Sequence, residues 1–216
     1  MKSVLVIGMG RFGQHLADEM LARGNEVMIV DEDPHRVEAL AHRFTDAQIG
    51  DCTNVEVLRS LGVSNFDVCF VAIGENFQSS LEISLLLKEL GAKKVVSKAN
   101  KEIQAKFLLR NGADEVVYPD RDIAVKTAIK YSANHVLDYV GLPGGLGMYE
   151  LRVPDAWIGR TIGAIDIRRK FGVNILAIRH GDEMKINLGA DYEFRSGDHM
   201  HIVGKESDIN RLTGRI

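Results

Sequence analysis

The feature that most constrains the fold of this chain is a glycine-rich segment close to its start. A short apolar run, Val4–Ile7, leads directly into Gly8-Met9-Gly10-Arg11-Phe12-Gly13. In this pattern the first glycine allows a tight turn out of a strand, the second lets a phosphate approach the backbone, and the third lets the next helix pack closely. The segment therefore predicts a buried strand, a phosphate-binding turn, and a helix whose N-terminal N–H groups face the phosphate.

An acidic cluster follows the next apolar run. Asp31, the first residue of Asp31-Glu32-Asp33, lies 18 positions beyond Gly13. A carboxylate that binds the hydroxyls of a ribose is expected about 20 residues after the glycines. The alternative is a glycine-rich turn that binds no ligand. Because strand, helix and acid occur in the expected order, the sequence favours a nucleotide site.

Composition limits the class of protein. The chain has 216 residues, of which 45% are hydrophobic and 26% are charged, as in ordinary soluble proteins. A net charge of −3 gives no general attraction to nucleic acid, so no nucleic-acid partner is expected. The two cysteines, Cys52 and Cys69, suit a reducing compartment. No apolar run is as long as a membrane span, and the first ends at Gly8, which predicts a cytoplasmic protein.

Strand and helix patterns alternate through the first half of the chain. Between the strands lie helical patterns bounded by residues such as Asn76, a predicted N-cap, and Gly91, a predicted helix stop. The alternation predicts an α/β fold, a Rossmann-like doubly wound parallel sheet over residues 1–119, with its ligand crevice at the carboxyl ends of the strands. The expected strands are Val4–Ile7, Val27–Val30, Ala47–Ile49, Val68–Ile73, Lys94–Ser97 and Glu115–Tyr118.

A different pattern begins at Asp120. The run from Asp120 to Asn134 predicts one helix that is apolar on more than one side. A helix of this kind is expected to lie between two bodies, so residues 120–135 are predicted to form a crossover or dimer helix. A loop is expected at Leu142–Gly147.

Residues 136–216 are predicted to form a small α+β lobe. Such a short module buries little surface, so a dimer partner is expected to stabilise it. The expected elements are a strand at 149–153, a helix at 161–170, a hairpin of 173–178 with 184–188, a strand at 199–203 and a helix at 205–212.

The C-terminal lobe offers no convincing catalytic group. A hydride-transfer enzyme needs a substrate domain with an acid or base over the nicotinamide, and no nucleophile–base pair is evident here. His199 and His201 share one strand face, but two ligands are too few for a metal, so a solvated face is expected. No catalytic residue is predicted.

Arg11 is the notable charge of the glycine segment. At the N-terminus of the predicted helix, its guanidinium would add a charged fork to the phosphate cradle. Such a group suits a nucleotide with extra terminal phosphate charge, or a phosphate of a nucleotide held by a second subunit.

Several motifs together resemble the RCK-domain regulatory subunits of potassium transport. The resemblance covers essentially the whole chain and is stronger to the KtrA/KtrC type than to bacterial TrkA. The motifs are Gly8–Gly13, the acidic end of the second strand, Val71–Asn76, Leu86–Leu90 and Arg169–Ile178.

The resemblance implies a cytosolic regulator rather than an enzyme. Such subunits have a Rossmann lobe, a crossover helix and a ligand-binding C-terminal lobe. They form homodimers that assemble into an octameric ring, which docks on the inner face of a membrane potassium-translocating subunit of KtrB/KtrD or TrkH type. ATP activates the ring and ADP inactivates it, with cyclic di-AMP as an inhibitor at the C-terminal lobe.

The resemblance also assigns residues to the nucleotide site. Arg11 would contact the nucleotide phosphates and Asp31 the ribose. The remaining cofactor-binding residues would be Gly8, Gly10, Phe12, Gly13, Glu32, Asp33, Asp51, Cys52, Ile73, Gly74, Glu75, Lys98, Ala99 and Asn100.

Two ligand sites of the family differ in this sequence. A family glutamate binds an activating cation, divalent or sodium, near the phosphates at the dimer interface, and Asp120 stands in its place within Tyr118-Pro119-Asp120. The C-terminal lobe lacks a proline often found in the cyclic di-AMP site, where Leu188–Ala190 fall.

Two other functions fit the glycine segment. Asp31 and the glycines suit NAD(H) as well as ATP or ADP, so a TrkA-type NAD(H)-sensing regulator is an alternative. A third hypothesis is a small NAD-dependent oxidoreductase, which is disfavoured because no substrate domain is evident.

Overall fold

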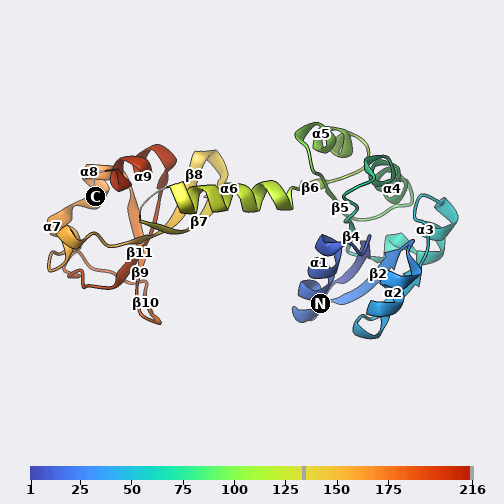
Figure 1. The fold of residues 1–216 in the computed structure, drawn as a ribbon, viewed down its shortest axis with the longest axis horizontal. Helices are drawn as coiled ribbons and strands as arrows, with labels where there is room; N and C mark the ends of the chain where they lie inside the picture. Colours follow the sequence, from blue (N-terminus) through green and yellow to red (C-terminus); the bar gives the residue numbers. More distant parts are fainter. Residues whose placement is uncertain (133–134, 215–216) are drawn as a thin grey trace. The chain divides into compact units, whose positions relative to one another are not determined.

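The computed structural model describes residues 1–132 and 135–214. The chain divides into two compact units, Met1–Arg121 and Asp122–Ile216, each with its own sheet (Figure 1). The end expected for the connecting helix, at Asn134, lies outside the described residues.

The N-terminal unit is built on a six-stranded parallel sheet with strand order β3-β2-β1-β4-β5-β6. This confirms the predicted Rossmann-like fold class. Short 3₁₀ turns at Ala41–Arg43 and Val63–Asn65 complete the connections. The elements are β1 (Ser3–Ile7), α1 (Arg11–Ala22), β2 (Glu26–Asp31), α2 (Pro34–Leu40), β3 (Asp46–Ile49), α3 (Val55–Leu61), β4 (Val68–Val71), α4 (Phe77–Glu89), β5 (Val95–Lys98), α5 (Glu102–Arg110) and β6 (Glu115–Val117).

Both faces of this sheet are buried, which explains the uninterrupted apolar strands. In β1, Leu5 packs in one core cluster with Leu58 of α3, whereas Val4 packs in the other with Ala17 of α1. Alternate side chains point to opposite faces of a strand, so β1 supplies both clusters at once. The strand order reverses between β1 and β4, and in such sheets the ligand crevice lies at that point, beyond the strands' carboxyl ends.

The helix α6 (Pro119–Ser132) begins in the N-terminal unit and continues into the second. None of its described residues is buried, and Tyr131 is 79% exposed. Lys126 of α6 forms an ion pair with Asp138 of the next strand at 2.9 Å. The role of this helix in a dimer stays a prediction. No helix in the described ranges combines the length and apolarity needed to cross a bilayer.

The C-terminal unit is an antiparallel sheet with order β10-β9-β11-β8-β7, flanked by short helices, and confirms the predicted α+β lobe. Its core is one cluster that includes Leu151, Met200 and Trp157. The elements are β7 (Val136–Leu142), β8 (Leu146–Arg152), α7 (Ile162–Ile165), α8 (Ile167–Phe171), β9 (Asn174–His180), β10 (Glu183–Lys185), β11 (Asp198–Lys205) and α9 (Glu206–Thr213), with 3₁₀ turns at Pro143–Gly145 and Asp155–Trp157.

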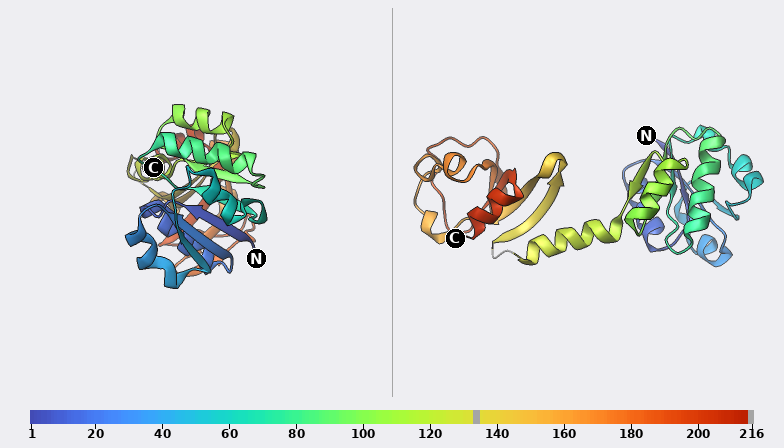
Figure 2. Two further views of the ribbon diagram at one scale, coloured as in Figure 1. Left: turned by 90° about the vertical axis from the view of Figure 1, so that its right-hand side faces the viewer. Right: turned by 90° about the horizontal axis from the view of Figure 1, so that it is seen from above.

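Two details of this unit differ from the sequence-based expectation. The segment expected as a loop at Leu142–Gly147 is the tight end of a β7–β8 hairpin, drawn in yellow in the right-hand view of Figure 2. Gly144 makes the turn with φ +76°. The single helix expected at 161–170 is two helices, because Asp166 adopts a left-handed conformation (φ 52°) between them.

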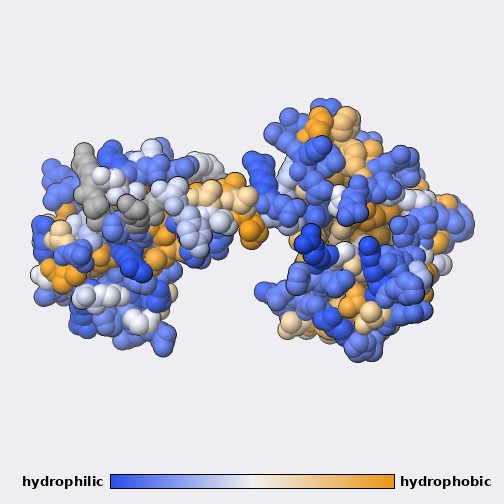
Figure 3. Space-filling view, viewed as in Figure 1, coloured by the Kyte–Doolittle hydropathy of each residue, from blue (hydrophilic) through white to orange (hydrophobic). Residues whose placement is uncertain are grey.

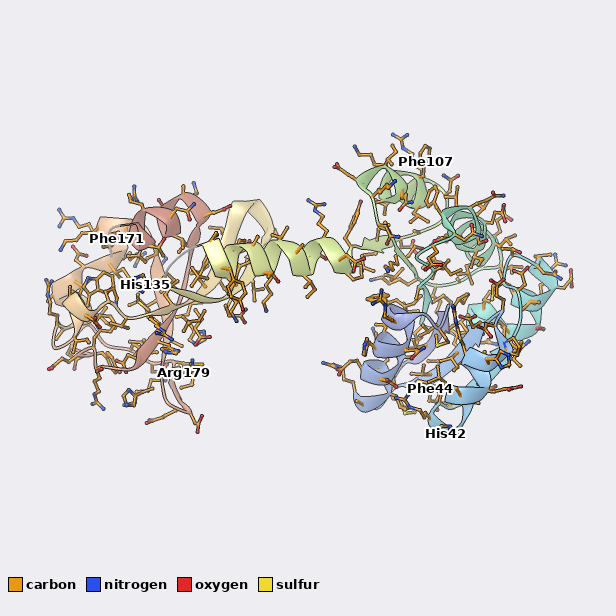
Figure 4. The ribbon with its side chains drawn as sticks, in the orientation of Figure 1. His42, Phe44, Phe107, His135, Phe171 and Arg179 are labelled. Atoms are coloured by element: carbon orange, nitrogen blue, oxygen red, sulfur yellow. The ribbon has the colours of Figure 1, made fainter. Side chains whose placement is uncertain are left out.

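The histidines of β11 do not lie on a solvated face as expected. His199 Nδ1 lies 2.9 Å from Glu150 Oε1 of β8, and Arg179 of β9, labelled in Figure 4, contacts both side chains. His201 Nε2 is buried and has no hydrogen-bond partner among the described residues. The face is half-buried because neighbouring strands of the sheet bring acidic and basic side chains together.

This cluster makes the stability of the C-terminal unit depend on pH. Burial raises the pKa of Glu150, but hydrogen bonds from Arg179 and His199 outweigh it and hold the pKa below 4.5. A carboxyl group whose pKa is lower in the folded state stabilises the fold at pH values above its unfolded-state pKa. This stabilisation is lost as the pH falls through the folded-state pKa. We expect Glu150→Gln to cost about 1–2 kcal/mol at neutral pH, and the cost to shrink as the pH falls through the lowered pKa of Glu150. Urea unfolding of both proteins across this pH range measures it; an equal loss at every pH contradicts this role.

Candidate functional site

A cavity of about 330 Å³ opens at the carboxyl ends of β1 to β5, at the predicted crevice. It brings together residues that are far apart in the sequence. Most of the residues predicted for the site line it: Gly8, Gly10, Arg11, Phe12, Asp31, Glu32, Asp51, Cys52, Ile73, Gly74, Glu75 and Lys98.

The three glycines have different local environments. Gly8 turns the chain with φ +97°, and its N–H donates to the carbonyl of Val30 at 2.8 Å. A Cβ at Gly13 would lie 1.9 Å from the carbonyl oxygen of Gly8, whereas one at Gly10 would meet nothing within 4 Å. Gly13 therefore permits the close packing of α1 on the loop and does not line the cavity. Gly10 leaves an open approach from the cavity to the backbone.

The first turn of α1 faces this approach. Gly10 is the N-cap, and no side chain caps the helix. The first N–H groups of a helix have no partner within the helix, and the dipole places partial positive charge there. Arg11, exposed at the first position of α1, adds a full positive charge to the cavity wall. This end of the cavity is suited to an anion.

Asp31 links the glycine loop to the end of β2. Its side chain is only 5% exposed, Oδ2 accepts the Met9 N–H at 2.5 Å, and Oδ1 accepts the Asp33 N–H at 2.9 Å. Each carboxylate oxygen has a second acceptor site, so Asp31 also retains capacity for ligand hydroxyls. Arg36 Nη1 lies 3.5 Å from Asp31 Oδ2, and Arg36 lines the cavity beside it.

Asp33 has another function. Its carboxylate caps α2 by accepting the His35 N–H at 2.9 Å, and it does not line the cavity. Arg36 Nε also lies 3.4 Å from Asp33 Oδ2. The sequence interpretation missed Arg36, although its position three residues after an N-cap aspartate is a detectable signal.

The turn after β3 forms another wall. Asp51 Oδ1 accepts from both the N–H (2.9 Å) and the hydroxyl (2.7 Å) of Thr53, a lining residue that the sequence interpretation missed. Burial, followed by the negative charges of Asp51 and Asp31, raises the pKa of Cys52 to about 12. Cys52 is therefore a protonated, packed thiol rather than a nucleophile.

The wall opposite is formed by the ends of β4 and β5. Asn100 Nδ2 donates to the carbonyl of Gly74 at 2.5 Å, so Asn100 supports this wall from outside the cavity. Ala99 is buried in the core with α5 and also does not line the cavity. Asn76 caps α4 as predicted, accepting from Ser79, a further lining residue that was missed.

Asp120, the predicted cation ligand, does not line the cavity. Its side chain is 88% exposed, and its Oδ2 lies 4.0 Å from the ammonium of Lys98. Among the described residues, no group of three His, Cys, Asp or Glu side chains is arranged to hold a metal. One exposed carboxylate beside an ammonium does not make a cation site, so a cation here would need ligands from outside a single chain.

The fold and this cavity define a class of protein. It has a Rossmann-type lobe, whose cavity combines a helix N-terminus with an acidic residue at the end of β2, followed by a small α+β lobe. Comparisons with known proteins agree. Residues 4–119 match the TrkA-N domain and residues 148–216 the TrkA-C domain. The RCK domain of GsuK has the same fold, with a TM-score of 0.69 and 17% identity over 99% of this chain; the match spans 47% of the GsuK chain.

Two sequence relatives cover nearly the whole length. Ktr system potassium uptake protein C of Bacillus subtilis is 38% identical over 100% of this chain and 97% of its own length. Ktr system potassium uptake protein A of the same organism is 36% identical over 98% and 95%. The chain therefore belongs to the RCK-domain regulatory subunits of potassium transport, with TrkA-N and TrkA-C domains and relatives of the KtrA/KtrC type, as its motifs predicted.

Proposed function

We propose that this chain is the nucleotide-sensing regulatory subunit of a Ktr-type potassium uptake system. ATP and ADP bind in the cavity of the N-terminal unit, and their exchange changes the shape of a ring that opens or closes a membrane potassium-translocating subunit. ATP favours the open state and ADP the closed one. The protein acts in the cytoplasm, at the inner face of the membrane, through that partner.

The observation that carries the proposal is the uncapped start of α1 facing the cavity next to the open side of Gly10. Backbone N–H groups and the helix dipole favour a phosphate there. Asp31, held at the end of β2 by two backbone N–H groups, offers acceptors for ribose hydroxyls. One nucleotide satisfies both ends of the cavity.

Positive side chains at the cavity explain how the number of phosphates would be sensed. A nucleotide shifts an equilibrium between two ring shapes only through different affinities for the two. ATP carries one more phosphate than ADP, and Arg11 stands where that charge is best compensated, in the same chain or across a subunit boundary.

Arg11→Ala is expected to reduce the preference between ATP and ADP more than it reduces total nucleotide binding. The adenosine end is held by Asp31 and the turn after β3, which the substitution leaves intact. Calorimetric titration of both nucleotides into the parent and the variant measures the two effects. Arg23→Ala, an exposed arginine at the other end of α1, is the matched control. Equal ATP and ADP affinities in the parent would refute the scheme.

Self-assembly is part of the proposal: homodimers that form an octameric ring. Apolar side chains gather over α5 in Figure 3, where Ile103, Phe107 and Leu109 are exposed, and Phe107 is labelled in Figure 4. In the second unit, Ile123 and Val125 of α6 are also exposed apolar residues. Clusters of this kind are typical of protein–protein contacts. Light scattering of the purified chain, with and without nucleotide, tests the assembly.

Two further ligands are proposed from the family. Cyclic di-AMP would bind the C-terminal lobe and inhibit. A cation at Asp120 would require nucleotide phosphates or a second chain's carboxylate, since residues 1–132 and 135–214 of one chain supply too few ligands. Titration with cyclic di-AMP, and ATP titrations with and without a divalent cation, test these two ligands separately.

An NAD(H)-sensing regulator is the second candidate. The cavity continues past the glycine loop to Ser79 and Ile83 of α4, on the side where the second half of a dinucleotide binds in Rossmann folds. Thermal unfolding with ATP, ADP and NADH separates the candidates. A larger shift with NADH than with ATP would favour the second.

A further inference from the structure

Lys98, the last residue of β5, holds an ammonium in an unusual position. Its side chain is only 15% exposed, and Nζ lies 5.8 Å from the ring centroid of Phe12 in the glycine loop. A Cβ at Gly74 would lie 3.1 Å from this nitrogen, so the absence of a side chain there leaves room for it. Lys98 thus presents its charge at the cavity wall, next to the phosphate end.

The charge of Lys98 is weakly compensated. Within the described ranges, Asp120 is the one carboxylate that reaches it, at 4.0 Å. Asp120 is 88% exposed, and a long ion pair with an exposed partner contributes about 0–1 kcal/mol. Burying an ammonium is costly unless it is well paired. An anion in the cavity that binds the ammonium more strongly would therefore replace Asp120 as the ion-pair partner of Lys98.

We propose that Lys98, in addition to Arg11, distinguishes a triphosphate from a diphosphate, and that it does so by exchanging partners. Without a terminal phosphate it pairs with Asp120; with one it pairs with the phosphate and releases Asp120. Asp120 is in the first turn of α6, so the exchange changes the charge balance at the start of the helix that joins the two units. This inference rests on the proposed nucleotide function and names a residue that would sense the terminal phosphate.

The scheme makes opposite predictions for the two partners. Removing the charge of Lys98 should weaken ATP binding more than ADP binding. Removing the charge of Asp120 should strengthen ATP binding in the absence of divalent cations, because it both frees Lys98 and removes a repelling charge. A cation ligand would behave the other way, losing ATP affinity when substituted.

The experiment titrates ATP and ADP into the full chain in a chelator, for the parent, Lys98→Met and Asp120→Asn. Methionine keeps an apolar stem over Phe12, and Lys94→Met, whose lysine pairs with Glu115 at 2.8 Å, is the control. We expect Lys98→Met to lower the ratio of ATP to ADP affinity about tenfold, Asp120→Asn to raise it about threefold, and the control to leave it unchanged. The gain from Asp120→Asn should shrink in the Lys98→Met background.

The outcomes distinguish a failure of the proposed nucleotide function from a failure of the partner exchange at Lys98. If the parent binds neither nucleotide, the proposed function fails. If the parent discriminates but Lys98→Met lowers both affinities equally, or Asp120→Asn leaves the ratio unchanged, only the partner exchange is overturned. Asp120→Asn alters an exposed side chain and should fold normally, so it decides the matter even if Lys98→Met is unstable.

Discussion

Gly13→Ala is expected to destabilise the N-terminal unit by about 3 kcal/mol, because the added methyl group clashes with the backbone. The added Cβ is fixed to the backbone of α1 and would lie 1.9 Å from the carbonyl oxygen of Gly8, a backbone atom of the β1–α1 turn. A flexible side chain could move aside, but here the helix itself must shift. Thermal and urea unfolding of the full chain measure the loss.

Gly10→Ala provides the matched control, since it adds the same methyl three residues earlier. Gly10 has φ −69° and ψ 179°, which alanine adopts without strain, and its Cβ would meet nothing within 4 Å. We expect unchanged unfolding but at least tenfold weaker nucleotide binding, because the methyl occupies the approach of the phosphate. A Gly13→Ala protein as stable as the parent, or a Gly10→Ala protein that binds normally, would contradict these roles.

Asp31→Asn is expected to have the second-largest effect, on both stability and binding. The carboxylate accepts N–H groups of Met9 and Asp33 on its two oxygens. An amide has only one acceptor oxygen, so its NH₂ would face a backbone N–H in a buried site. The free energy of unfolding should fall by about 1–3 kcal/mol. Nucleotide affinity should fall about a hundredfold, because acceptors for the ribose hydroxyls are lost.

Asp33→Asn is the control for charge. It removes one negative charge from the same acidic cluster, yet asparagine caps helices as well as aspartate. Its unfolding and its nucleotide affinity should stay close to those of the parent. If Asp31→Asn and Asp33→Asn weaken binding equally, the general charge of the cluster matters, rather than the position of Asp31.

The architecture of the N-terminal unit was predictable because local signals agree along it. Apolar strands, helix caps such as Asn76 and stops such as Gly91 each mark the same boundaries that packing later requires. In the C-terminal unit these signals conflict. Glycines of the 142–147 segment suggested a loop, although they form the tight turn of a hairpin, and nothing in the sequence marked the left-handed Asp166.

The candidate site was predictable in outline but not in each residue's role. Asp31 and Asp33 look alike in sequence, and only the geometry separates the cavity carboxylate from the helix cap. Asn100 was predicted to contact the ligand; in the structure it donates to the carbonyl of Gly74 and does not line the cavity. The spacing of Arg36 from Asp33 was detectable in the sequence, but its contact with Asp31 depends on the turn between the two residues, which the sequence pattern did not show.

The central claim is that this chain reads the phosphorylation state of a nucleotide and changes its assembly in response. The most direct test is calorimetric titration of the purified full chain with ATP and with ADP, followed by small-angle scattering of each complex. The account predicts one nucleotide site per chain, different affinities for ATP and ADP, and different scattering profiles. Equal affinities with identical profiles, or no binding of either nucleotide, would contradict it.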